Sequence, residues 1–510
     1  MSASAPASTY ITTAIDYANG APHMGHAFEK IGADAMARYR RLKGESVHFV
    51  MGMDEHGLKV LQSAESAGVT PQQWVDGIAS EFAAMWKRLL ISNDDFIRTT
   101  EDRHIRGAIA LIERIQAADA FYRGRYEGWY CVGCESFKRE DELVIDDAGV
   151  RRCMLHPNRE ANWSEENNWF FRLTQYREAL LQLYDERPGF IQPEPRYNEV
   201  RRLVEAGLED ISVSRSIPWG IPWPGDPTQT VWVWIEALIN YVTATGFPAP
   251  GWERHWPAAY HVIGKDITRF HCVIWPAMLM AARIDVPVAV WAHGFFTFAG
   301  RKLSKSEGVR IELKDAVDRF GPDAFRYYIL RDVPWNDDGE FSWERFESRY
   351  NADLADDLGN LVNRSISMIE RYRGGTVPAG ERTWLDDEMA TACDRYTHVM
   401  DANLLHQGAA VAMSLAVAAN GFIEARAPWA QAKDPALATQ LDATLASLAR
   451  TLLATATMLE PFMPAKMADL VTRFGLDAVP RLHGLKAVDA AGRTARRGDV
   501  LFPKDRPESA

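Results

Sequence analysis

Several features that would assign the chain to a special class of protein are missing. Only five of its 510 residues are cysteines, too few for the disulfide framework of a small secreted protein. No stretch approaches the roughly 18 consecutive apolar residues of a membrane span, and residues 1–6 lack the basic and apolar regions of a signal peptide. Internal repeats and low-complexity segments are absent as well. We therefore expect a cytoplasmic protein that makes no contact with a membrane.

An excess of positive charge is also missing. The 57 lysines and arginines face 69 aspartates and glutamates, which gives a formal net charge of −12. This balance argues against broad electrostatic attraction to nucleic acid, so an RNA partner would need a local basic surface. The length is too great for one hydrophobic core and predicts about two to four domains.

Two patterns of hydrophobic periodicity divide the chain. Short strand candidates alternate with helical patterns from residue 10 to about 120 and again after residue 231, which is typical of a parallel α/β sheet. Residues 121–226 are rich in Gly, Trp, Tyr and Cys and predict short strands. After Trp343 long amphipathic patterns predict a helix bundle, with helices at 345–373, 386–402, 404–426 and 436–458.

The stretch from Pro22 to His26 lies between a predicted strand and a predicted helix. A turn that contains glycine at a helix start presents free N–H groups and the positive end of the helix dipole, a common site for phosphate. His23 and His26 add hydrogen-bond donors there. The pair is equally compatible with simple capping of the helix, and the spacing also allows two metal ligands on one helical face.

Other polar residues stand at the ends of predicted strands. Asp54 and His56 follow the strand 47–53, at the edge of a parallel sheet where ligands bind, although either residue could also be a helix cap. Further along, residues 300–308 carry Lys302 and Lys305 between glycines and serines. Lysine is a compact cation that suits phosphate oxygens, but a solvated surface loop would have the same composition.

Cysteine and histidine gather in one segment of the chain. Cys131 and Cys134 form one CxxC pair, and Cys153 with His156 forms a CxxH pair. Thiolates and a neutral imidazole are preferred zinc ligands, and four protein ligands leave no open coordination position. The pattern predicts a structural Zn²⁺ site, the alternative being four unliganded side chains.

Taken together, the motifs resemble those of the class I aminoacyl-tRNA synthetases. His23-Met24-Gly25-His26 is similar to the HIGH motif, and the segment 302–306 (Lys-Leu-Ser-Lys-Ser) is similar to the KMSKS loop, with Leu303 at the usual Met position. Details resemble the methionyl-tRNA synthetase family over nearly the whole chain: the strand segment 14–20, and the segment 263–267 with His271 and Trp275.

The resemblance implies a fold and a set of parts. It implies an α/β class protein with a split Rossmann-like nucleotide-binding domain, an inserted connective module that holds the zinc knuckle, and an all-α anticodon-binding helix bundle. The parts are 1–120 and 227–300 for the two catalytic halves, 121–226 for the insertion, 301–343 for the KMSKS-like loop and connecting fold, and 344–510 for the bundle.

The resemblance also implies a two-step reaction. Methionine attacks the α-phosphate of ATP, which is bound with Mg²⁺, and the methionyl group of the resulting adenylate then passes to the terminal ribose of tRNA(Met), the initiator tRNA included. His23, His26, Lys302 and Lys305 would stabilise the charge that develops on the phosphates. The residues implied for ATP binding are Gly25, Glu29, Gly264, Asp266, His293, Gly294, Lys302 and Lys305.

The same resemblance assigns residues to the other substrates. Asp54 would hold the ammonium of methionine, and the residues implied for its side-chain pocket are Ile15, Tyr17, Trp234, Leu238, Tyr241, His271 and Trp275. Core packing is the competing explanation for these aromatics. Trp429 would stack on an anticodon base, with Asn360 and Arg364 as neighbours that ordinary helix surface explains equally well.

Departures from the family pattern are few. Leu238 and Asp16 stand where some members carry proline, which leaves the finer pocket shape open. The appended C-terminal dimerisation domain of longer members is not found, so we expect a monomer. The insertion of about a hundred residues is too small for the editing domain of the leucine, isoleucine and valine enzymes. The cysteine enzymes carry a zinc-binding cysteine ahead of the HIGH motif, whereas no cysteine precedes Cys131 in this chain. A non-catalytic RNA-binding paralogue would be expected to lose some of the four motif residues.

Overall fold

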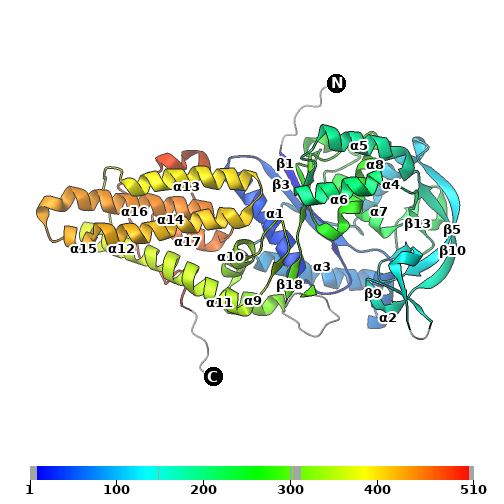
Figure 1. Ribbon diagram of the computed structural model, residues 1–510, viewed down its shortest axis with the longest axis horizontal. Helices are drawn as coiled ribbons and strands as arrows, with labels where there is room; N and C mark the ends of the chain where they lie inside the picture. Colours follow the sequence, from blue (N-terminus) through cyan, green and yellow to red (C-terminus); the bar gives the residue numbers. More distant parts are fainter. Residues whose placement is uncertain (1–7, 147–148, 299–300, 303–311, 505–510) are drawn as a thin grey trace. The chain divides into compact units, whose positions relative to one another are not determined.

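The computed structural model describes residues 8–146, 149–298, 301–302 and 312–504. The chain divides into two compact units. Unit 1 comprises Met1–Pro22, His48–Met85 and Asn93–Ala292, and unit 2 comprises His23–Val47, Trp86–Ser92 and His293–Ala510. Each unit contains segments that are distant in the sequence (Figure 1).

A seven-stranded sheet forms the centre of unit 1. Its order is β11 (Ile191–Gln192), β17 (Ala289–His293), β16 (Tyr260–Gly264), β1 (Thr9–Thr13), β3 (Val47–Asp54) and β2 (Asp16–Tyr17), with β4 (Asp95–Arg98) also paired to β3. Pairs β1–β16, β11–β17, β2–β3 and β3–β4 are all parallel. The last six residues of β3 are buried without interruption, as expected for a strand covered on both faces. The predicted α/β class is confirmed.

Outside residues 121–226, the described α-helices of unit 1 are α2 (Leu58–Ala67), α4 (Asp102–Ala117), α7 (Val233–Thr243), α8 (Trp275–Ala281) and most of α3 (Pro71–Arg88). Helices α4 and α7 pack closely, since a Cβ on Gly107 would lie 2.4 Å from the Thr243 Cγ2. A π-helical stretch, Arg269–Ile274, precedes α8 and carries His271. Such stretches occur often at functional sites.

The segment 121–226 contains more than the short strands predicted for it. Strands β5 (Phe121–Cys131) and β10 (Asn162–Phe171) are long and pair antiparallel along their length. Two helices, α5 (Arg177–Glu186) and α6 (Glu194–Glu205), follow, and β11 between them pairs with β17 of the central sheet. Few of their residues are buried, for example only Val200 and Val204 in α6. Because most of the other side chains are charged or polar, the sequence showed no clear helical period of apolar residues there.

The smaller strands of this segment form three further groups. Strands β6 (Ser136–Lys138) and β12 (Ile211–Ser212) extend the β5–β10 sheet. A three-stranded sheet contains β7 (Leu143–Ile145), β8 (Arg151–Cys153) and β9 (His156–Glu160), and another contains β13 (Ser214–Arg215), β15 (Asp226–Val231) and β14 (Pro222–Trp223). The tight turns between them bring the cysteines together.

The described residues of unit 2 are mainly helical, and they include a small sheet of β18 (Phe296–Phe298), β19 (Arg301–Lys302) and β20 (Gly339–Glu340). The predicted bundle is present as α12 (Asn360–Arg373), α13 (Trp384–Asp401), α14 (Leu405–Arg426), α16 (Ala438–Leu459) and α17 (Pro464–Thr472). The helix predicted over 345–373 consists of α11 (Trp343–Arg349), a π-helical stretch (Tyr350–Gly359) and α12.

Helix α1 (Met24–Leu42) belongs to unit 2 and packs on α10 (Pro322–Asp332), which follows α9 (Leu313–Phe320). The fully buried Arg326 guanidinium lies 2.7 Å from the fully buried Asp34 carboxylate. A Cβ on Gly32 would collide with the Trp335 ring at 2.1 Å, so only glycine allows this approach. These contacts fix the helix whose first turn carries His23 and His26.

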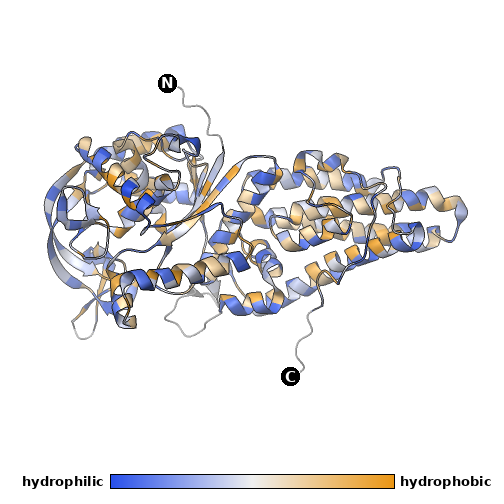
Figure 2. Cartoon of the chain, turned by 180° about the vertical axis from the view of Figure 1, so that it is seen from behind, coloured by the Kyte–Doolittle hydropathy of each residue, from blue (hydrophilic) through white to orange (hydrophobic). Residues whose placement is uncertain are grey.

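Within the described residues, one segment is long and apolar enough to cross a membrane, Leu405–Gln431, with a mean hydropathy of 1.4. Most of it is α14, which packs against α13 and α16 within the bundle. Figure 2 shows hydrophobic and hydrophilic residues alternating along the bundle helices. Burial in the bundle explains the composition of α14.

Candidate functional site

His23 and His26 cap helix α1 reciprocally, an arrangement we call the histidine cap. The His23 Nδ1 accepts from the N–H groups of Gly25 at 3.1 Å and His26 at 3.4 Å, and the His26 Nδ1 accepts from the N–H of His23 at 3.3 Å. The two rings stack with centroids 3.6 Å apart. Because each neutral ring accepts at Nδ1, its proton must be on Nε2, where it is a donor. Capping and a donor role are therefore compatible.

Behind the cap in unit 2, Glu29 is paired on both sides. Its Oε1 lies 2.7 Å from Lys30 Nζ, and its Oε2 lies 3.2 Å from His293 Nε2. Although burial raises the pKa of Glu29, Lys30 and His293 outweigh it and lower that pKa below its usual value. His293 also contacts the Gly294 carbonyl at 2.7 Å. A Cβ on Gly294 would lie 2.0 Å from the Asp337 carbonyl oxygen, so the backbone there needs glycine.

The predicted lysine loop is only partly within the described residues. Lys302 is the second residue of β19, and its backbone pairs with Thr297 of β18. Lys305 lies outside the described residues, as does the rest of the loop through residue 311.

Asp54 and Tyr17 are register partners in unit 1. Tyr17 of β2 stands beside Asp54 at the end of β3, and the Ala18 N–H donates to the Asp54 carbonyl at 2.9 Å. Asp54 is 8% exposed, and its Oδ1 has no hydrogen-bond partner among the described residues. Burial, followed by the charges of Glu236 and Glu135, raises the pKa of Asp54 well above its usual range. This carboxyl group would gain from a cation.

Sequence reasoning missed Glu236. This fully buried residue of α7 accepts a short hydrogen bond from His56 Nδ1, and its Oε2 has no partner among the described residues. Burial lowers the pKa of His56, but Glu236 reverses the effect and raises it. His104, whose Nδ1 lies 2.9 Å from Thr243 Oγ1, has a pKa lowered to about 3 by burial, His56 and Arg103. One acid inside the apolar run 231–241 was the available signal.

The predicted aromatic residues of unit 1 lie in one region. The Tyr241 hydroxyl is 2.6 Å from His271 Nε2, and His271 Nδ1 is 3.1 Å from the Ile267 carbonyl oxygen. Because a carbonyl only accepts, His271 carries its proton on Nδ1 and accepts from Tyr241 at Nε2. The Trp275 indole donates to His261 at 3.2 Å. Tyr241 and Trp275 also belong to the core of unit 1.

Trp234 stacks on Phe270 with centroids 4.5 Å apart and stays partly exposed, whereas Leu238 is 3% exposed. Ile15 is half-buried, and a Cβ on Gly52 would lie 3.0 Å from its Cγ2. We refer below to the acid–aromatic cluster, defined as Tyr17, Asp54, Trp234, Glu236, Tyr241 and His271. All six residues belong to unit 1.

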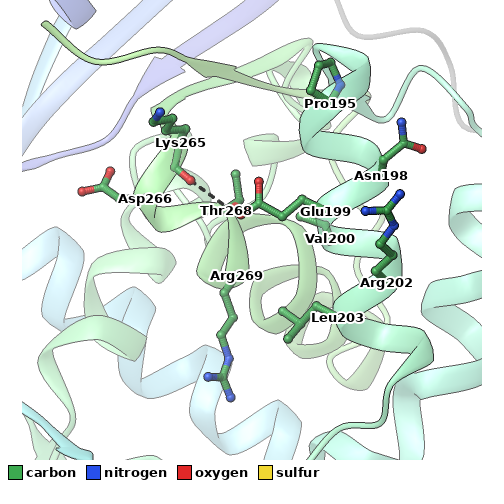
Figure 3. Close-up of a pocket in the computed structure, with 10 residues that line it drawn as sticks. All are labelled: Pro195, Asn198, Glu199, Val200, Arg202, Leu203, Lys265, Asp266, Thr268 and Arg269. Atoms are coloured by element: carbon green, nitrogen blue, oxygen red, sulfur yellow. Dashed lines mark hydrogen bonds between the residues drawn. The ribbon is translucent and has the colours of Figure 1, made fainter. Parts of the chain in front are cut away.

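Gly264 and Asp266 stand at the end of β16. Gly264 is buried in the strand, and Asp266 is exposed in the single helical turn Lys265–Ile267. A cavity of about 600 Å³ lies between this turn and α6 (Figure 3). Asp266 and Lys265 line it together with the exposed Arg202 and Arg269. In Figure 3 Asp266 points away from α6.

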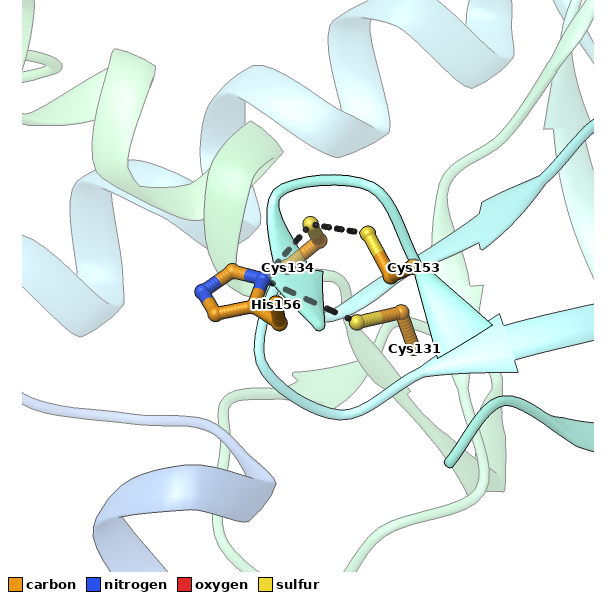
Figure 4. A group of neighbouring side chains, drawn as sticks. All are labelled: Cys131, Cys134, Cys153 and His156. Carbon is orange, nitrogen blue, oxygen red and sulfur yellow. Dashed lines mark hydrogen bonds between the residues drawn. The ribbon is translucent and has the colours of Figure 1, made fainter. Parts of the chain in front are cut away.

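The four predicted zinc ligands converge (Figure 4); we call Cys131, Cys134, Cys153 and His156 the knuckle. Their ligand atoms all lie within 4.8 Å of one another, and no other described residues form such a group. The Cys134 Sγ is 3.3 Å from His156 Nδ1 and 3.6 Å from the Cys153 Sγ. A tetrahedron with zinc–sulfur bonds of about 2.3 Å has edges of about 3.8 Å. The donor set and its spacing fit Zn²⁺.

The candidate RNA-binding residues belong to unit 2. Trp429 lies in the short helix α15 (Pro428–Gln431) and is 41% exposed. Asn360 is exposed, and the Arg364 guanidinium pairs with Glu424 of α14 at 2.5 Å. Helix α12 thus lies beside α14, the helix that leads to Trp429.

Two family models of known proteins together match almost the whole chain. The family model of class I tRNA synthetases (M) matches residues 9–366, and the model of the anticodon binding domain of methionyl tRNA ligase matches residues 373–508. The chain belongs to the methionyl-tRNA synthetase family. It is therefore an aminoacyl-tRNA synthetase, a ligase, and the resemblance predicted from the two motifs is confirmed.

Relatives of this synthetase match over almost its full length. The methionine–tRNA ligase of Brucella suis is 43% identical over 506 residues, covering 97% of both chains. That of Thermotoga maritima is 39% identical over 508 residues, covering 97% of this chain and 80% of the relative. The Mycobacterium tuberculosis methionyl-tRNA synthetase in complex with methionyl-adenylate superposes with a TM-score of 0.92 at 38% identity, covering 97% of this chain and 99% of that one.

Proposed function

We propose that this synthetase activates L-methionine with ATP and then charges tRNA(Met), the initiator tRNA included. Asp54 carries the proposal, because a buried carboxyl group with an unpartnered oxygen is suited to an ammonium ion. The aromatic rings near it suit a polarizable thioether. The solved M. tuberculosis enzyme, similar over the same length, was captured with methionyl-adenylate.

The first step is an in-line displacement at the α-phosphorus. A carboxylate oxygen of methionine forms the new P–O bond while the bond to the β-phosphate oxygen breaks and pyrophosphate leaves. The Nε2–H groups of His23 and His26 would donate to the phosphate oxygens, supported by Lys302 and Lys305. ATP would bring Mg²⁺, which neutralises part of the phosphate charge. Gly25, Glu29, Gly264, Asp266, His293 and Gly294 would hold the nucleotide.

In the second step a hydroxyl of the terminal tRNA ribose attacks the methionyl carbonyl carbon. An ester forms, and AMP leaves with the electrons of the broken mixed-anhydride bond. Trp429 would stack on an anticodon base, flanked by Asn360 and Arg364. Replacing Trp429 by alanine should then raise the KM for tRNA about tenfold and leave methionine activation unchanged.

The methionine side would use the set predicted from the resemblance. Asp54 binds the ammonium, and the thioether chain is lined by Ile15, Tyr17, Trp234, Leu238, Tyr241, His271 and Trp275. Burial of Tyr241 against His271 orients the imidazole through a hydrogen bond of 2.6 Å. Orientation by such second partners is what holds a binding geometry in place.

The knuckle would hold one structural zinc ion through Cys131, Cys134, Cys153 and His156. The ion would cross-link two turns of the inserted module and leave no position for substrate. Metal analysis of freshly purified, unchelated protein should find about one zinc per chain. We further infer a cytoplasmic monomer, organised as two catalytic halves (1–120 and 227–300), a connective module (121–226), a loop region (301–343) and the anticodon-binding bundle (344–510).

Exchange of pyrophosphate into ATP without tRNA tests the proposal. Each of the standard amino acids is supplied in turn, and only methionine should support exchange. Exchange with a different amino acid, or none in zinc-loaded and folded protein, would overturn the assignment.

A further inference from the structure

Glu135 occupies an unusual position next to the knuckle. It directly follows Cys134 and is 4% exposed. Its φ of 49° is a left-handed backbone conformation that residues other than glycine seldom adopt. An acidic side chain is also seldom buried unless it has partners. Both features suggest that contacts hold Glu135 in place.

Two of these contacts reach the strand and helix beside the acid–aromatic cluster. The Glu135 Oε2 accepts from the Tyr17 hydroxyl at 2.7 Å, and its Oε1 accepts from the Lys59 N–H at 2.8 Å. Lys59 lies in the first turn of α2, where backbone N–H groups lack partners within the helix. A Cβ on Gly57 would lie 2.7 Å from the Glu135 carboxylate and 2.8 Å from the Tyr17 hydroxyl, so glycine admits this close approach.

The backbone of the same turn also contacts the start of α7. The Glu135 carbonyl accepts from the Trp232 indole at 2.8 Å, and the Cys134 carbonyl accepts from the Trp234 indole at 3.2 Å. Tyr17, in turn, is the register partner of Asp54. One turn of the knuckle therefore contacts Tyr17 of β2 as well as Trp232 and Trp234 at the start of α7.

We infer that Glu135 is a positioning residue for methionine, which transmits the order of the knuckle to Tyr17. The inference rests on the proposed function, because it takes Tyr17 as a wall of the methionine site. Glu135 acts through the Tyr17 hydroxyl and does not contact the substrate. Its loss should weaken methionine binding and leave the binding of ATP intact.

Two substitutions of Glu135 separate the effect of side-chain length from that of side-chain charge. Glu135→Asp keeps the charge and tolerates the left-handed conformation, but it is one methylene too short to span both donors. Glu135→Gln keeps the length, and its amide oxygen can still accept from the Lys59 N–H. Glu160→Ala, an exposed acid of β9 in the same module, is the matched control.

Methionine binding is measured by calorimetry without ATP, together with zinc content. We expect Glu135→Asp to weaken methionine binding about tenfold, and Glu135→Gln and Glu160→Ala to change it less than about threefold, all with zinc retained. The reverse order for Asp and Gln would make charge the important property and overturn the inference. Unchanged binding in both Glu135 variants, or equal losses of methionine and ATP affinity, would overturn it as well.

A double-mutant cycle with Tyr17→Phe tests the route. If Glu135 acts through Tyr17, adding Glu135→Asp to Tyr17→Phe should cost less than about threefold more, whereas independent effects would multiply. If Glu135→Asp loses zinc, Tyr17→Phe alone tests the route, because it removes the hydroxyl through which Glu135 acts and should weaken methionine binding to a similar extent with zinc retained. Failure of the proposed function would instead appear in the wild-type protein, as absence of methionine-dependent exchange.

Discussion

The histidine cap and the acid–aromatic cluster satisfy their polar groups in opposite ways. At the cap, each Nδ1 accepts from backbone, and Glu29 behind it is paired with Lys30 and His293. In the cluster, the Asp54 Oδ1 and the Glu236 Oε2 are buried without a partner among the described residues. The first arrangement is complete without a ligand, and the second is not.

This difference indicates how each region works. A buried, unsatisfied polar atom costs about 1–3 kcal/mol, more if the group is charged, so the acids of the cluster destabilise the free protein. A ligand ammonium would recover that cost on binding. The histidine cap does not carry this energetic cost, and its fixed rings suit stabilisation of charge that appears only in the transition state. The acid–aromatic cluster should therefore determine the affinity for methionine, and the histidine cap should determine the reaction rate.

The largest effect is expected at the cap. Asparagine at His23 keeps a capping acceptor but removes the Nε2 donor. We expect His23→Asn to lower the rate of pyrophosphate exchange by about 10²–10³-fold, the range for loss of one transition-state donor. Methionine affinity should change less than about threefold.

The matched control for this variant is His398→Ala, an exposed histidine of α13. Its exchange rate should equal that of the wild type. Equal losses of exchange rate and methionine affinity in His23→Asn would contradict the assignment of the cap to rate.

The next effect concerns stability and has opposite signs in the two regions. Glu29→Gln removes the buried carboxylate charge that pairs with Lys30 and with His293, which should lower the free energy of unfolding by about 3 kcal/mol. Asp54→Asn removes an unpartnered charge and should raise that free energy by about 1 kcal/mol. Denaturant unfolding of the free proteins gives both values. A destabilised Asp54→Asn would show that Asp54 is already satisfied.

The smallest effect is a pH dependence. Because the pKa of Asp54 is raised in the folded protein, the folded state holds this proton at pH values where the unfolded state has released it. The contribution of Asp54 to stability therefore falls as pH rises from its unfolded to its folded pKa. Methionine affinity should rise over the same window, by at most about tenfold per pH unit, since the ammonium needs the carboxylate. Titration calorimetry at several pH values should find this slope in the wild type and lose it in Asp54→Asn.

Local patterns in the sequence predicted much of this molecule. Alternating strand and helix patterns, the bundle, and the convergence of Cys131, Cys134, Cys153 and His156 depend on residues close in the sequence, so spacing alone revealed them. The π-helical stretch before α12 was not predicted, because the prediction used only the 3.6-residue period of an α-helix and had no separate signal for i→i+5 hydrogen bonds.

Contacts between distant residues were out of reach. Glu236 and His56 form a hydrogen bond although they are 180 residues apart in the sequence, and Glu135 and Tyr17 are 118 residues apart. Local periodicity in the sequence therefore cannot predict either pair. Helices α5 and α6 were missed for a different reason: their exposed faces are highly charged, and the apolar stripe is too narrow to reveal the period. The roles given to the motif histidines and lysines came from the family resemblance and stay predictions.

The most direct test of the contrast compares methionine with its deaminated analogue, which keeps the carboxylate and the thioether but lacks the ammonium. Calorimetry measures both ligands on the wild type and on Asp54→Asn. If the unpartnered carboxyl group of Asp54 binds the ammonium, the wild type should prefer methionine by about 50-fold or more, and Asp54→Asn should bind the two ligands within about threefold of each other. A variant that keeps the full preference for methionine would contradict this role of Asp54.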